Sequence, residues 1–484
     1  MDQEIELKLN IAASDSGKII ATGLFPGRRK SVRQTSIYFD TADHALAKSG
    51  ISLRIRTVRK RKVQTVKFAR GSLFRRGEWE RSVSDDVPVL DTASPLADFF
   101  GDHAEPFVTL FRVENMRTLW MFIDQDAALE IVLDRGEIVA NGWRRPICEL
   151  ELELKAGNPS VLFDWARHID AFVPIRIGVI SKCEAGYRLI EASGGSIKAE
   201  PVVLDSEMHA SEAFQHIIRN CLRQYRLNED VLLAESAPAA LHQARVALRR
   251  LRSALRLFRP MVKGRRFELL SEDLKWLSGN LGRARDIDVL LSEDLPGDLH
   301  IQLHRVRLDA YAKVRSALES PKSRLLMLDI MEWTETGKWL HHSGRTDTRD
   351  TPVAQFAQER LETLFTRLLR SGHDLDAMLD SERHALRKQV KKLRYSAEFF
   401  AGLYTKGKSR KHCIRFLATL EDVQDRLGAL TDQTMRRALL KELGIKDAVI
   451  RSEERSASAR AKMLRSAQDA MENLNDIKKF WREK

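Results

Sequence analysis

The sequence predicts an α+β protein of more than one domain, in which a sheet region is followed by an all-helical region. Up to about residue 190 the apolar residues recur mainly with a period of two, which is typical of strands with one buried face. Beyond residue 205 the period lengthens to about 3.6, in long segments rich in Leu, Ala and Arg. Between them, the stretch ASGGSIKAEP at 192–201 is small and polar and ends in Pro, which indicates a linker.

Acidic side chains alternate along the first and last strands of the sheet region. The sets that share one face are Glu4 and Glu6, with Lys8, in EIELK, and Glu149, Glu151 and Glu153 in CELELELK. Two carboxylates about 4 Å apart repel by roughly 4 kcal/mol at an effective dielectric near 20, whereas a fold is stable by only about 5–15 kcal/mol. A divalent cation would remove this repulsion. Ligands that are all oxygen, without His or Cys, favour Mg²⁺ or Mn²⁺.

A simpler explanation stays open for each run, because a half-buried strand in water also alternates, with its glutamates facing solvent. The strands between the two runs favour a shared site, since each carries charge on one parity and apolar residues on the other. These charged positions are Arg54, Arg56, Lys67, Arg76, Glu78, Glu80, Arg112, Glu130 and Asp134. A closed sheet would gather carboxylates, Arg and Lys in one cavity, which suits metal-bound phosphate.

EIELK matches the ExExK signature of the CYTH family, the triphosphate tunnel metalloenzymes, which this region resembles. The similarity continues in order through YFDTAD at 38–43, LRIR, the TVK strand, ICELELELK and SKCEAGYRL at 181–189, over about 190 residues. The resemblance implies an eight-stranded antiparallel tunnel. The metal ligands that it implies are Glu4, Glu6, Glu149 and Glu151, with Glu153 and Asp134 as further candidates. The residues that it implies for triphosphate binding are Lys8, Arg54, Arg56, Lys67, Arg76, Arg112 and Lys182.

The excess of basic charge lies almost wholly after the linker. Of 81 Lys and Arg and 68 Asp and Glu, residues 1–200 carry 29 and 28, which leaves 52 and 40 for residues 201–484. The resulting net charge of +12, against +1 before the linker, points to an anionic partner such as nucleic acid, a membrane surface or another polyanion. From the chain's length we expect a tunnel domain at 1–191, a linker at 192–205 and a helical domain at 206–480.

The cysteines and the N-terminus favour a cytoplasmic protein. The four cysteines, Cys148, Cys183, Cys221 and Cys413, form no C-x-x-C pair, which is typical of free thiols rather than of zinc sites or disulfides. The sequence MDQEIELKLN is not a signal peptide, and no uncharged run of about 18 residues occurs, so we expect no membrane insertion.

The helical region repeats itself. HQARVALRRLR at 242–252 aligns without gaps with HALRKQVKKLR at 384–394, an offset of 142 residues. A second match joins Leu281, Gly282 and Asp286 to Leu427, Gly428 and Asp432, at an offset of 146. The pattern predicts a duplicated helical unit with the polar segment 341–352 as its joint.

Each copy carries a row of basic side chains at steps of three and four, which lie on one helical face. The first row is His242, Arg245, Arg249, Arg252 and Arg256, with Arg250 beside it, and the second is His384, Arg387, Lys391 and Arg394, with Lys392 beside it. A solvated face with ion pairs is the ordinary explanation for such a row, and a capping or buried role is the ordinary one for its His. However, no Asp or Glu occurs at 242–259 or at 385–396. Two cationic faces brought together by the duplication would form a groove for an extended polyanion.

The repeated H-x-x-R-x-x-x-[RK]-[RK]-L-R pattern, followed by LGRARDIDVL in one copy and QDRLGALTD in the other, resembles the CHAD domain over roughly residues 206–480. The resemblance implies that the two rows bind long-chain inorganic polyphosphate, with association with polyphosphate granules as an option. Asp286 and Asp432 are anionic, so we expect them to orient Arg side chains or cap helices. Thr431 stands where the second copy often has Asn, which leaves that loop less well defined.

A CYTH domain followed by a CHAD domain resembles bacterial inorganic triphosphatases of that type. The prediction is metal-dependent hydrolysis of tripolyphosphate to pyrophosphate and phosphate, with Mg²⁺ or Mn²⁺, joined to a polyphosphate-binding domain. Thiamine triphosphatase and adenylate cyclase are alternatives with the same fold. A non-catalytic polyphosphate-binding scaffold is an alternative of another class, although a pure binder gains little from so many carboxylates. Nucleic acid is disfavoured as a partner, because no aromatic residue interleaves the charged faces.

Overall fold

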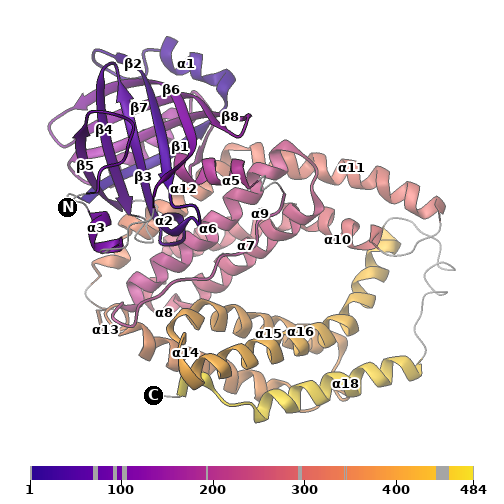
Figure 1. Ribbon diagram of the computed structural model, residues 1–484. Helices are drawn as coiled ribbons and strands as arrows, with labels where there is room; N and C mark the ends of the chain where they lie inside the picture. The colour runs from indigo at the N-terminus through magenta and orange to yellow at the C-terminus, as the bar shows by residue number, and fades with distance from the viewer. Residues whose placement is uncertain are drawn as a thin grey trace. The chain divides into compact units, whose positions relative to one another are not determined.

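The computed structural model describes residues 3–68, 75–90, 95–100, 106–191, 195–292, 297–342, 344, 346–442 and 457–482. The chain divides into two compact units. Unit 1 consists of Met1–Ser196 and Ala317–Gly337, and unit 2 consists of Ile197–Ser316 and Lys338–Lys484 (Figure 1). The predicted combination of an N-terminal antiparallel sheet with a C-terminal helical region is confirmed.

Unit 1 is built on a closed antiparallel sheet. Its strands are β1 Gln3–Ile11, β2 Lys30–Asp40, β3 Ile51–Val58, β4 Arg61–Phe68, β5 Arg75–Val83, β6 Val108–Ile123, β7 Ala128–Ala140, β8 Trp143–Ala156 and β9 Ile175–Ile177. They follow the order β5-β4-β3-β2-β6-β7-β8-β1-β9, and pairing of β5 with β1 closes the tunnel. The expected eight strands form the tunnel, and the short β9 continues the edge of β1 beyond β5.

The alternation along β1 and β8 follows from this closure. Leu7 and Leu152 are at most 1% exposed and lie on the parity opposite to that of Glu6 and Glu151. The helix α4 (Ser160–Asp170) packs on β1 and β8 from outside the tunnel. The apolar parity therefore forms the core with α4, and the charged parity lines the tunnel.

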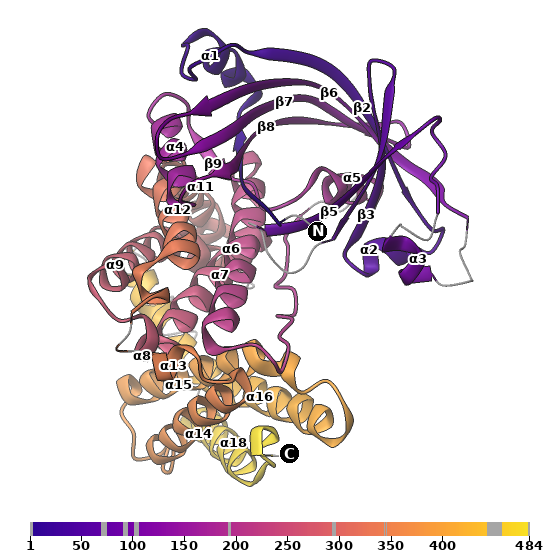
Figure 2. The same ribbon diagram turned by 90° about the vertical axis from the view of Figure 1, so that its left-hand side faces the viewer.

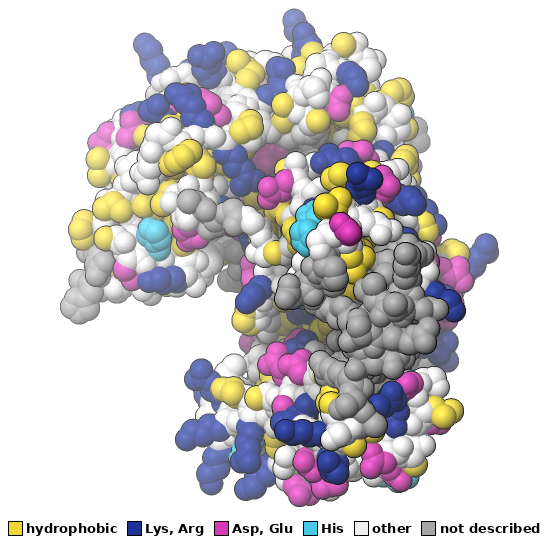
Figure 3. Space-filling view, turned by 90° about the vertical axis from the view of Figure 1, so that its right-hand side faces the viewer, with side chains coloured by type: hydrophobic (Ala, Val, Ile, Leu, Met, Phe, Trp, Pro, Cys, Tyr) yellow, Lys and Arg dark blue, Asp and Glu magenta, His cyan; other side chains and the backbone are white. Residues whose placement is uncertain are grey.

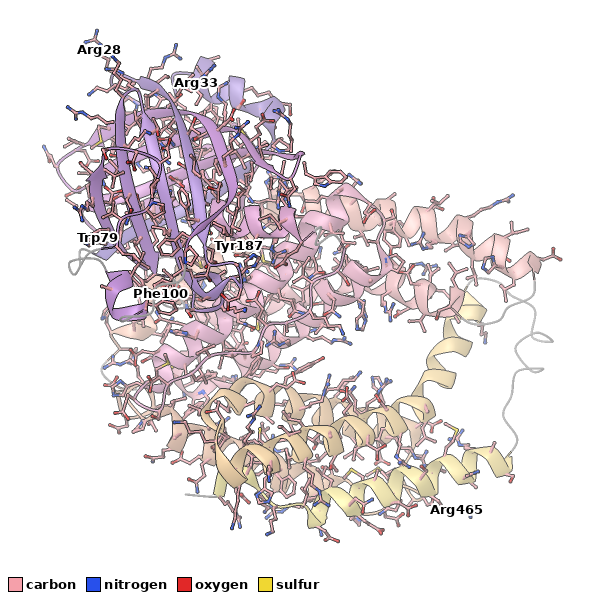
Figure 4. All side chains as sticks on the ribbon, viewed as in Figure 1. Arg28, Arg33, Trp79, Phe100, Tyr187 and Arg465 are labelled. Atoms are coloured by element: carbon pink, nitrogen blue, oxygen red, sulfur yellow. The ribbon has the colours of Figure 1, made fainter. Side chains whose placement is uncertain are left out.

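The helix α5 (Lys182–Ile190) packs on β6, β7 and β8 at one end of the tunnel (Figure 2). Ala185 joins an apolar cluster with Tyr38, Phe111 and neighbouring side chains of the sheet. A Cβ on Gly186 would lie 2.2 Å from the Phe111 ring, so only glycine allows this close approach. Tyr187, which is labelled in Figure 4, donates a hydrogen bond to Asp40. These contacts fix α5 against the sheet.

The remaining helices of unit 1 include one that comes from far along the chain. The short elements η1 Ala13–Asp15, α1 Ser16–Ala21, α2 Ala45–Lys48 and α3 Pro95–Phe100 follow the strands in sequence. The helix α12 (Pro321–Thr336) lies within the range 206–480 that we expected to be the helical domain, yet it belongs to unit 1. It packs on α4 and β9 (Figure 2).

Unit 2 is helical. Its elements are α6 Ala210–Ala234, α7 Pro238–Leu257, α8 Arg259–Val262, α9 Arg265–Asn280, α10 Gly282–Leu291, most of α11 Gly297–Glu319, η2 Lys338–Leu340, α13 Thr346–Arg349, α14 Val353–Ser371, α15 Asp380–Phe400, η4 Ala401–Leu403, α16 Gly407–Glu442, α18 Ala457–Asp476 and η5 Phe480–Arg482. The two basic helices, α7 and α15, pack on each other, α6 packs on α7, and α14 packs on α15. One difference between the copies is that the first is interrupted between α9 and α10, where α16 is continuous.

Two expected connections take a definite form. Part of the expected linker at 192–205 packs on unit 2, because Val202 and Leu204 are buried and Asn228 exchanges two hydrogen bonds with the Ile197 backbone. Residues 192–194 lie outside the described residues, as do 343 and 345 of the expected joint at 341–352. Within the part of the chain that is described, no helix is both long and apolar enough to cross a membrane.

Candidate functional site in the tunnel

Three carboxylates from two neighbouring strands converge inside the tunnel. Asp134 on β7 lies directly opposite Glu149 on β8, and Lys8 on β1 lies opposite Glu151, so all four side chains share the inner face. Oxygen atoms of Asp134, Glu149 and Glu151 lie within 4.8 Å of one another. We call these three residues the carboxylate cluster.

Three basic side chains contact the carboxylate cluster. Lys182 Nζ lies 2.7 Å from Asp134 Oδ2 and 3.1 Å from Glu151 Oε1, and it also donates to Glu149. Lys8 Nζ lies 2.7 Å from Glu151 Oε1. Arg117 Nε and Nη2 donate to the two oxygens of Asp134 over 2.9 and 2.6 Å, and Nη2 also lies 2.9 Å from Glu151 Oε2. The bidentate pair fixes the plane of the Asp134 carboxylate.

These contacts keep the buried groups charged. Burial acts to raise the pKa of Asp134, but Lys182 and Arg117 lower it below its ordinary value. The pKa of Glu151 is held well below its ordinary value in the same way, against burial, by Lys182, Lys8 and Arg117. Burial acts to lower the pKa of Lys182, whereas its three carboxylate neighbours raise it. Asp134 and Glu151 are therefore ionised at neutral pH, as metal ligands must be.

The opposite wall of the tunnel carries further cations. Arg54 and Lys67 lie 3.7 and 3.1 Å from Glu78 Oε1. Burial, together with Arg54 and Arg117, lowers the pKa of Arg56 to about 10. Nε of Arg56 is buried without a hydrogen-bond partner among the described residues. This wall is suited to an anion that has several oxygens.

The structure brings some of the expected residues together and leaves others apart. Glu6 is buried, and its carboxylate lies 3.6 Å from Lys8 Nζ. Glu153 pairs with Lys155 nearer the solvent, and burial raises its pKa. Backbone pairing sets Glu4 opposite Arg76, but both side chains lie outside the described residues.

Arg112 is not part of the cluster. Its side chain is 54% exposed and pairs with Glu114 over 2.8 Å, whereas Arg117, five positions further along β6, points inward. Residues an odd number apart on a strand face opposite sides. The sequence did not distinguish the two arginines, because neither parity of β6 is consistently apolar. A signal in the sequence was that Arg117 shares its parity with the polar residue Asn115. In the structure Asn115 also points inward and donates to Asp134 over 2.7 Å.

The carboxylate cluster has the chemistry of a site for a hard divalent cation. All three side chains offer oxygen, and ligands on opposite sides of Mg²⁺ lie about 4 Å apart, which is compatible with the observed convergence. Asp134, Glu149 and Glu151 are thus the described residues best placed to hold such a cation, with Glu6 nearby.

The basic rows of unit 2 form a second candidate site. Burial and the nearby charges of Arg285, Arg249, Arg245 and Lys391 lower the pKa of His242 to about 4. Because Lys391 lies on α15 and His242 on α7, the two rows meet near this point. Nη1 of Arg245 and Nε of Arg249 are buried without a hydrogen-bond partner among the described residues. On the face in Figure 3, Lys and Arg lie among Asp and Glu over much of the surface, whereas a group of Lys and Arg at the lower left has no Asp or Glu among it.

A second basic group adds arginines that the repeat did not reveal. Burial and the charges of Arg367, Arg360 and Arg256 lower the pKa of Lys392. Arg360 and Arg367 lie on α14. The helix in the same place of the first copy, α6, has no motif that matches them, so comparison of the two copies could not find these arginines. Arg252 likewise has its pKa lowered by burial and by Arg256.

Two members of the rows have other partners. Arg250 is 3% exposed, donates to Gln224 over 3.0 Å and lies over the Phe399 ring, so it stabilises the helical core. Arg394 lies 3.3 Å from Glu398, which stands just beyond the acid-free stretch, and 3.6 Å from Glu421. For His384, burial and the charges of nearby Lys and Arg lower the pKa.

The chain thus combines a closed sheet, lined by carboxylates and basic side chains, with a helical unit that carries two basic rows. Residues 2–187 match the family model of the CYTH domain, and residues 216–441 match that of the CHAD domain. The chain therefore carries a CYTH domain followed by a CHAD domain.

Individual relatives cover parts of the chain. An inorganic triphosphatase of Haemophilus influenzae is 30% identical over 202 residues, which are 39% of this chain and 55% of that protein. The crystal structure of the CHAD domain from the plant Ricinus communis covers 59% of this chain and 98% of its own, at 30% identity and a TM-score of 0.48. A putative adenylyl cyclase from Hippeastrum, described as having a dominant triphosphatase activity, covers 38% and 95%, at 22% identity and a TM-score of 0.31.

Proposed function

We propose that the tunnel hydrolyses inorganic tripolyphosphate to pyrophosphate and phosphate, with Mg²⁺ or Mn²⁺ as cofactor. The observation that carries this proposal is the convergence of three carboxylates with Lys8, Lys182 and Arg117 on the inner face of the tunnel. Carboxylates alone would serve a metal, and cations alone would serve an anion. Their combination suits a metal-bound polyanionic substrate.

The proposed roles follow from position. Asp134, Glu149 and Glu151 would hold the metal, which supplies charge neutralisation and a bound water of lowered pKa. Lys8, Lys182 and Arg117 already touch these carboxylates, so phosphoryl oxygens beside the metal lie within their reach. From the opposite wall, Arg54 and Arg56 would bind the rest of the chain of phosphates. Arg56 is well suited to this, because an incoming anion offsets the burial that lowers its pKa.

Thiamine triphosphate and ATP are the competing substrates. Each carries the same three phosphoryl groups, so the cations of the tunnel alone do not select among them. The relative with 30% identity is named an inorganic triphosphatase, which favours tripolyphosphate. A non-catalytic scaffold is the alternative of another class, and it does not account for the carboxylate cluster.

The test is phosphate release by the full chain from tripolyphosphate, ATP and thiamine triphosphate, each with Mg²⁺, with Mn²⁺ and with a chelator. We expect tripolyphosphate to be the best substrate and the chelator to abolish turnover. Binding of tripolyphosphate without turnover in any metal would support the scaffold instead.

We further propose that the rows on α7 and α15 bind long-chain polyphosphate. Buried guanidinium nitrogens of Arg245 and Arg249 lack hydrogen-bond partners among the described residues, and the pKa of His242 is depressed by burial and surrounding cations. A bound polyanion would accept hydrogen bonds from these nitrogens and would offset the positive charge that lowers the pKa of His242. Arg360 and Arg367 beside Lys392 would extend this surface. A cytoplasmic location, with polyphosphate granules as one place of residence, stays a prediction.

A further inference from the structure

The helix α12 is buried on more than one side, although it lies more than 100 residues after the rest of unit 1 in the sequence. Nine of its 16 residues are buried, which is more than the single face that a surface helix buries. The chain leaves unit 2 after Ser316, contributes Ala317–Gly337 to unit 1, and returns to unit 2 at Lys338. The tunnel unit is thus completed by a segment that lies within the match to the CHAD domain.

A buried ion pair joins α12 to the end of α4. Arg324 Nε lies 2.7 Å from Asp170 Oδ1, and Nη2 lies 3.1 Å from Oδ2, with side chains that are 7% and 5% exposed. Asp170 Oδ1 also accepts the backbone N–H of Ile175 over 3.0 Å, and Ile175 is the first residue of β9. Asp170 therefore connects α12 to the start of β9.

β9 lies beside the backbone of Lys8 and shortly precedes Lys182 in the chain. It pairs with β1 at Leu9–Ile11, and the N–H of Gly178, the next residue, donates to the Lys8 carbonyl over 2.8 Å. A Cβ on Gly178 would lie 3.0 Å from the Lys8 Cβ, so this approach is close. Three residues later, Ser181 caps α5, and Lys182 is the first residue of that helix.

A second link between α4 and α12 bypasses β9. Arg167 donates to Asp329 over 2.7 Å and also to Glu332. It joins the same two helices as the Arg324–Asp170 pair, and no hydrogen bond or ion pair joins its side chain to β9 among the described residues. The chain thereby provides a matched control for the effect of loosening α12 in general.

We propose that Arg324 is a positioning residue of the tunnel: through Asp170 it holds β9, and through β9 it sets the places of Lys8 and Lys182 beside the carboxylate cluster. This inference rests on the proposed function of that cluster. It makes α12 part of the triphosphate site rather than an element of the helical unit.

The test compares Arg324→Gln, Arg324→Lys, Asp170→Asn and Arg167→Gln in the full chain, well below each melting temperature. Because a misplacement of about 1 Å can cost on the order of 10²-fold, we expect Arg324→Gln and Asp170→Asn to raise KM for tripolyphosphate about tenfold, with a smaller change in kcat. Arg324→Lys should recover part of the loss. The double variant Arg324→Gln with Asp170→Asn should have a KM no higher than that of either single variant, since both changes break the same ion pair.

Arg167→Gln should lower the melting temperature and leave KM within about twofold, because only the helix contact is lost. An equal rise in KM for Arg167→Gln and Arg324→Gln would overturn the proposal, as would a change in Arg324→Gln confined to melting temperature. Binding of tripolyphosphate in chelator, measured by calorimetry, separates the two proposals. Absence of hydrolysis by the wild-type chain would reject the proposed function, whereas equal dissociation constants for wild type and Asp170→Asn would reject the positioning role.

Discussion

Gly282 lies against Arg245, so that a Cβ at position 282 would stand 3.1 Å from Arg245 Nη1. The second copy has the same relationship, because a Cβ on Gly428 would stand 2.9 Å from Arg387 Nη2. The matched glycines of the repeat therefore leave room for the matched arginines of the basic rows. Asp286, 4.0 Å from Arg245, is placed to orient the first of them, as the sequence predicted, whereas the side chain of Asp432 lies outside the described residues.

Gly282→Ala and Gly428→Ala should therefore weaken polyphosphate binding, because each methyl group displaces a guanidinium that faces the polyanion. We expect a loss of about three- to tenfold for each, or roughly 1 kcal/mol. Gly279→Ala is the control, since a Cβ there meets nothing within 4 Å. That change should leave affinity unchanged and stabilise α9 by about 0.5–1 kcal/mol. Equal affinity of all three variants would contradict the role of the glycines.

Replacing Arg245, Arg249, Arg252, Arg387, Lys391 and Arg394 together by Ala should abolish polyphosphate binding by the full chain. Either set of three alone should only weaken it, because the rows meet where Lys391 approaches His242. Wild-type affinity should fall steeply with salt, since each engaged phosphate releases counterions. Binding isotherms at several salt concentrations measure this, with duplex DNA as comparison. Affinity that survives all six changes would refute the two-row site.

Glu362 should make the helical unit sensitive to acid. Burial acts to raise the pKa of Glu362, but Arg482, Trp481 and Lys479 together lower it to about 2 from 4.5. A carboxyl whose pKa is lower in the folded state contributes stability above pH 4.5, and this contribution is lost as the pH falls toward 2.

The difference in urea midpoint between wild type and Glu362→Gln should accordingly be largest near pH 6 and should vanish near pH 2. Glu359→Gln, on the same helix but exposed, is the control and should show little difference at either pH. A difference between wild type and Glu362→Gln that does not vary between pH 6 and pH 2 would show that these contacts do not depend on the charge of Glu362.

The sequence predicted what depends on local period and missed what depends on long-range packing. Alternation predicted the carboxylates that share a face, and the resemblance to the CYTH family implied the tunnel. The observed register agrees, since it puts Glu149 opposite Asp134 and Glu151 opposite Lys8. α12 belongs to unit 1, where it packs on α4 and β9, and its Arg324 pairs with Asp170, 154 residues away. No local pattern encodes such a pair. A fragment of residues 1–200 ends at the linker that the sequence predicts, but it lacks Arg324, the partner of Asp170. The position of the linker is therefore not enough to predict that such a fragment is active.

Glu151→Gln should reduce tripolyphosphate turnover by orders of magnitude, because it removes one charge from the carboxylate cluster while preserving its shape. It should also lower the melting temperature, since Lys8, Lys182 and Arg117 all contact this carboxylate. Loss of one partner of a buried ion pair costs about 3–5 kcal/mol. Binding of Mn²⁺, followed by spectroscopy, should weaken in parallel.

Glu137→Gln is the control for Glu151→Gln, because Glu137 pairs with Arg144 on the outer face of β7. Turnover and Mn²⁺ affinity should be unchanged in this variant. If Glu151→Gln keeps wild-type turnover and Mn²⁺ affinity, the carboxylate cluster is not the metal site.

Arg117→Ala and Arg112→Ala distinguish the structural assignment from the sequence-based one. The two residues share β6 but face opposite sides, with Arg117 on Asp134 and Glu151 and Arg112 on Glu114. We expect Arg117→Ala to lower kcat/KM for tripolyphosphate by about 10²–10³-fold, the range seen when one donor is removed from a site that stabilises developing negative charge. Arg112→Ala should change it less than about twofold, because exposed ion pairs contribute little. If steady-state kinetics show a larger loss of kcat/KM for Arg112→Ala than for Arg117→Ala, Arg112 binds the substrate and Arg117 is a structural partner of Asp134.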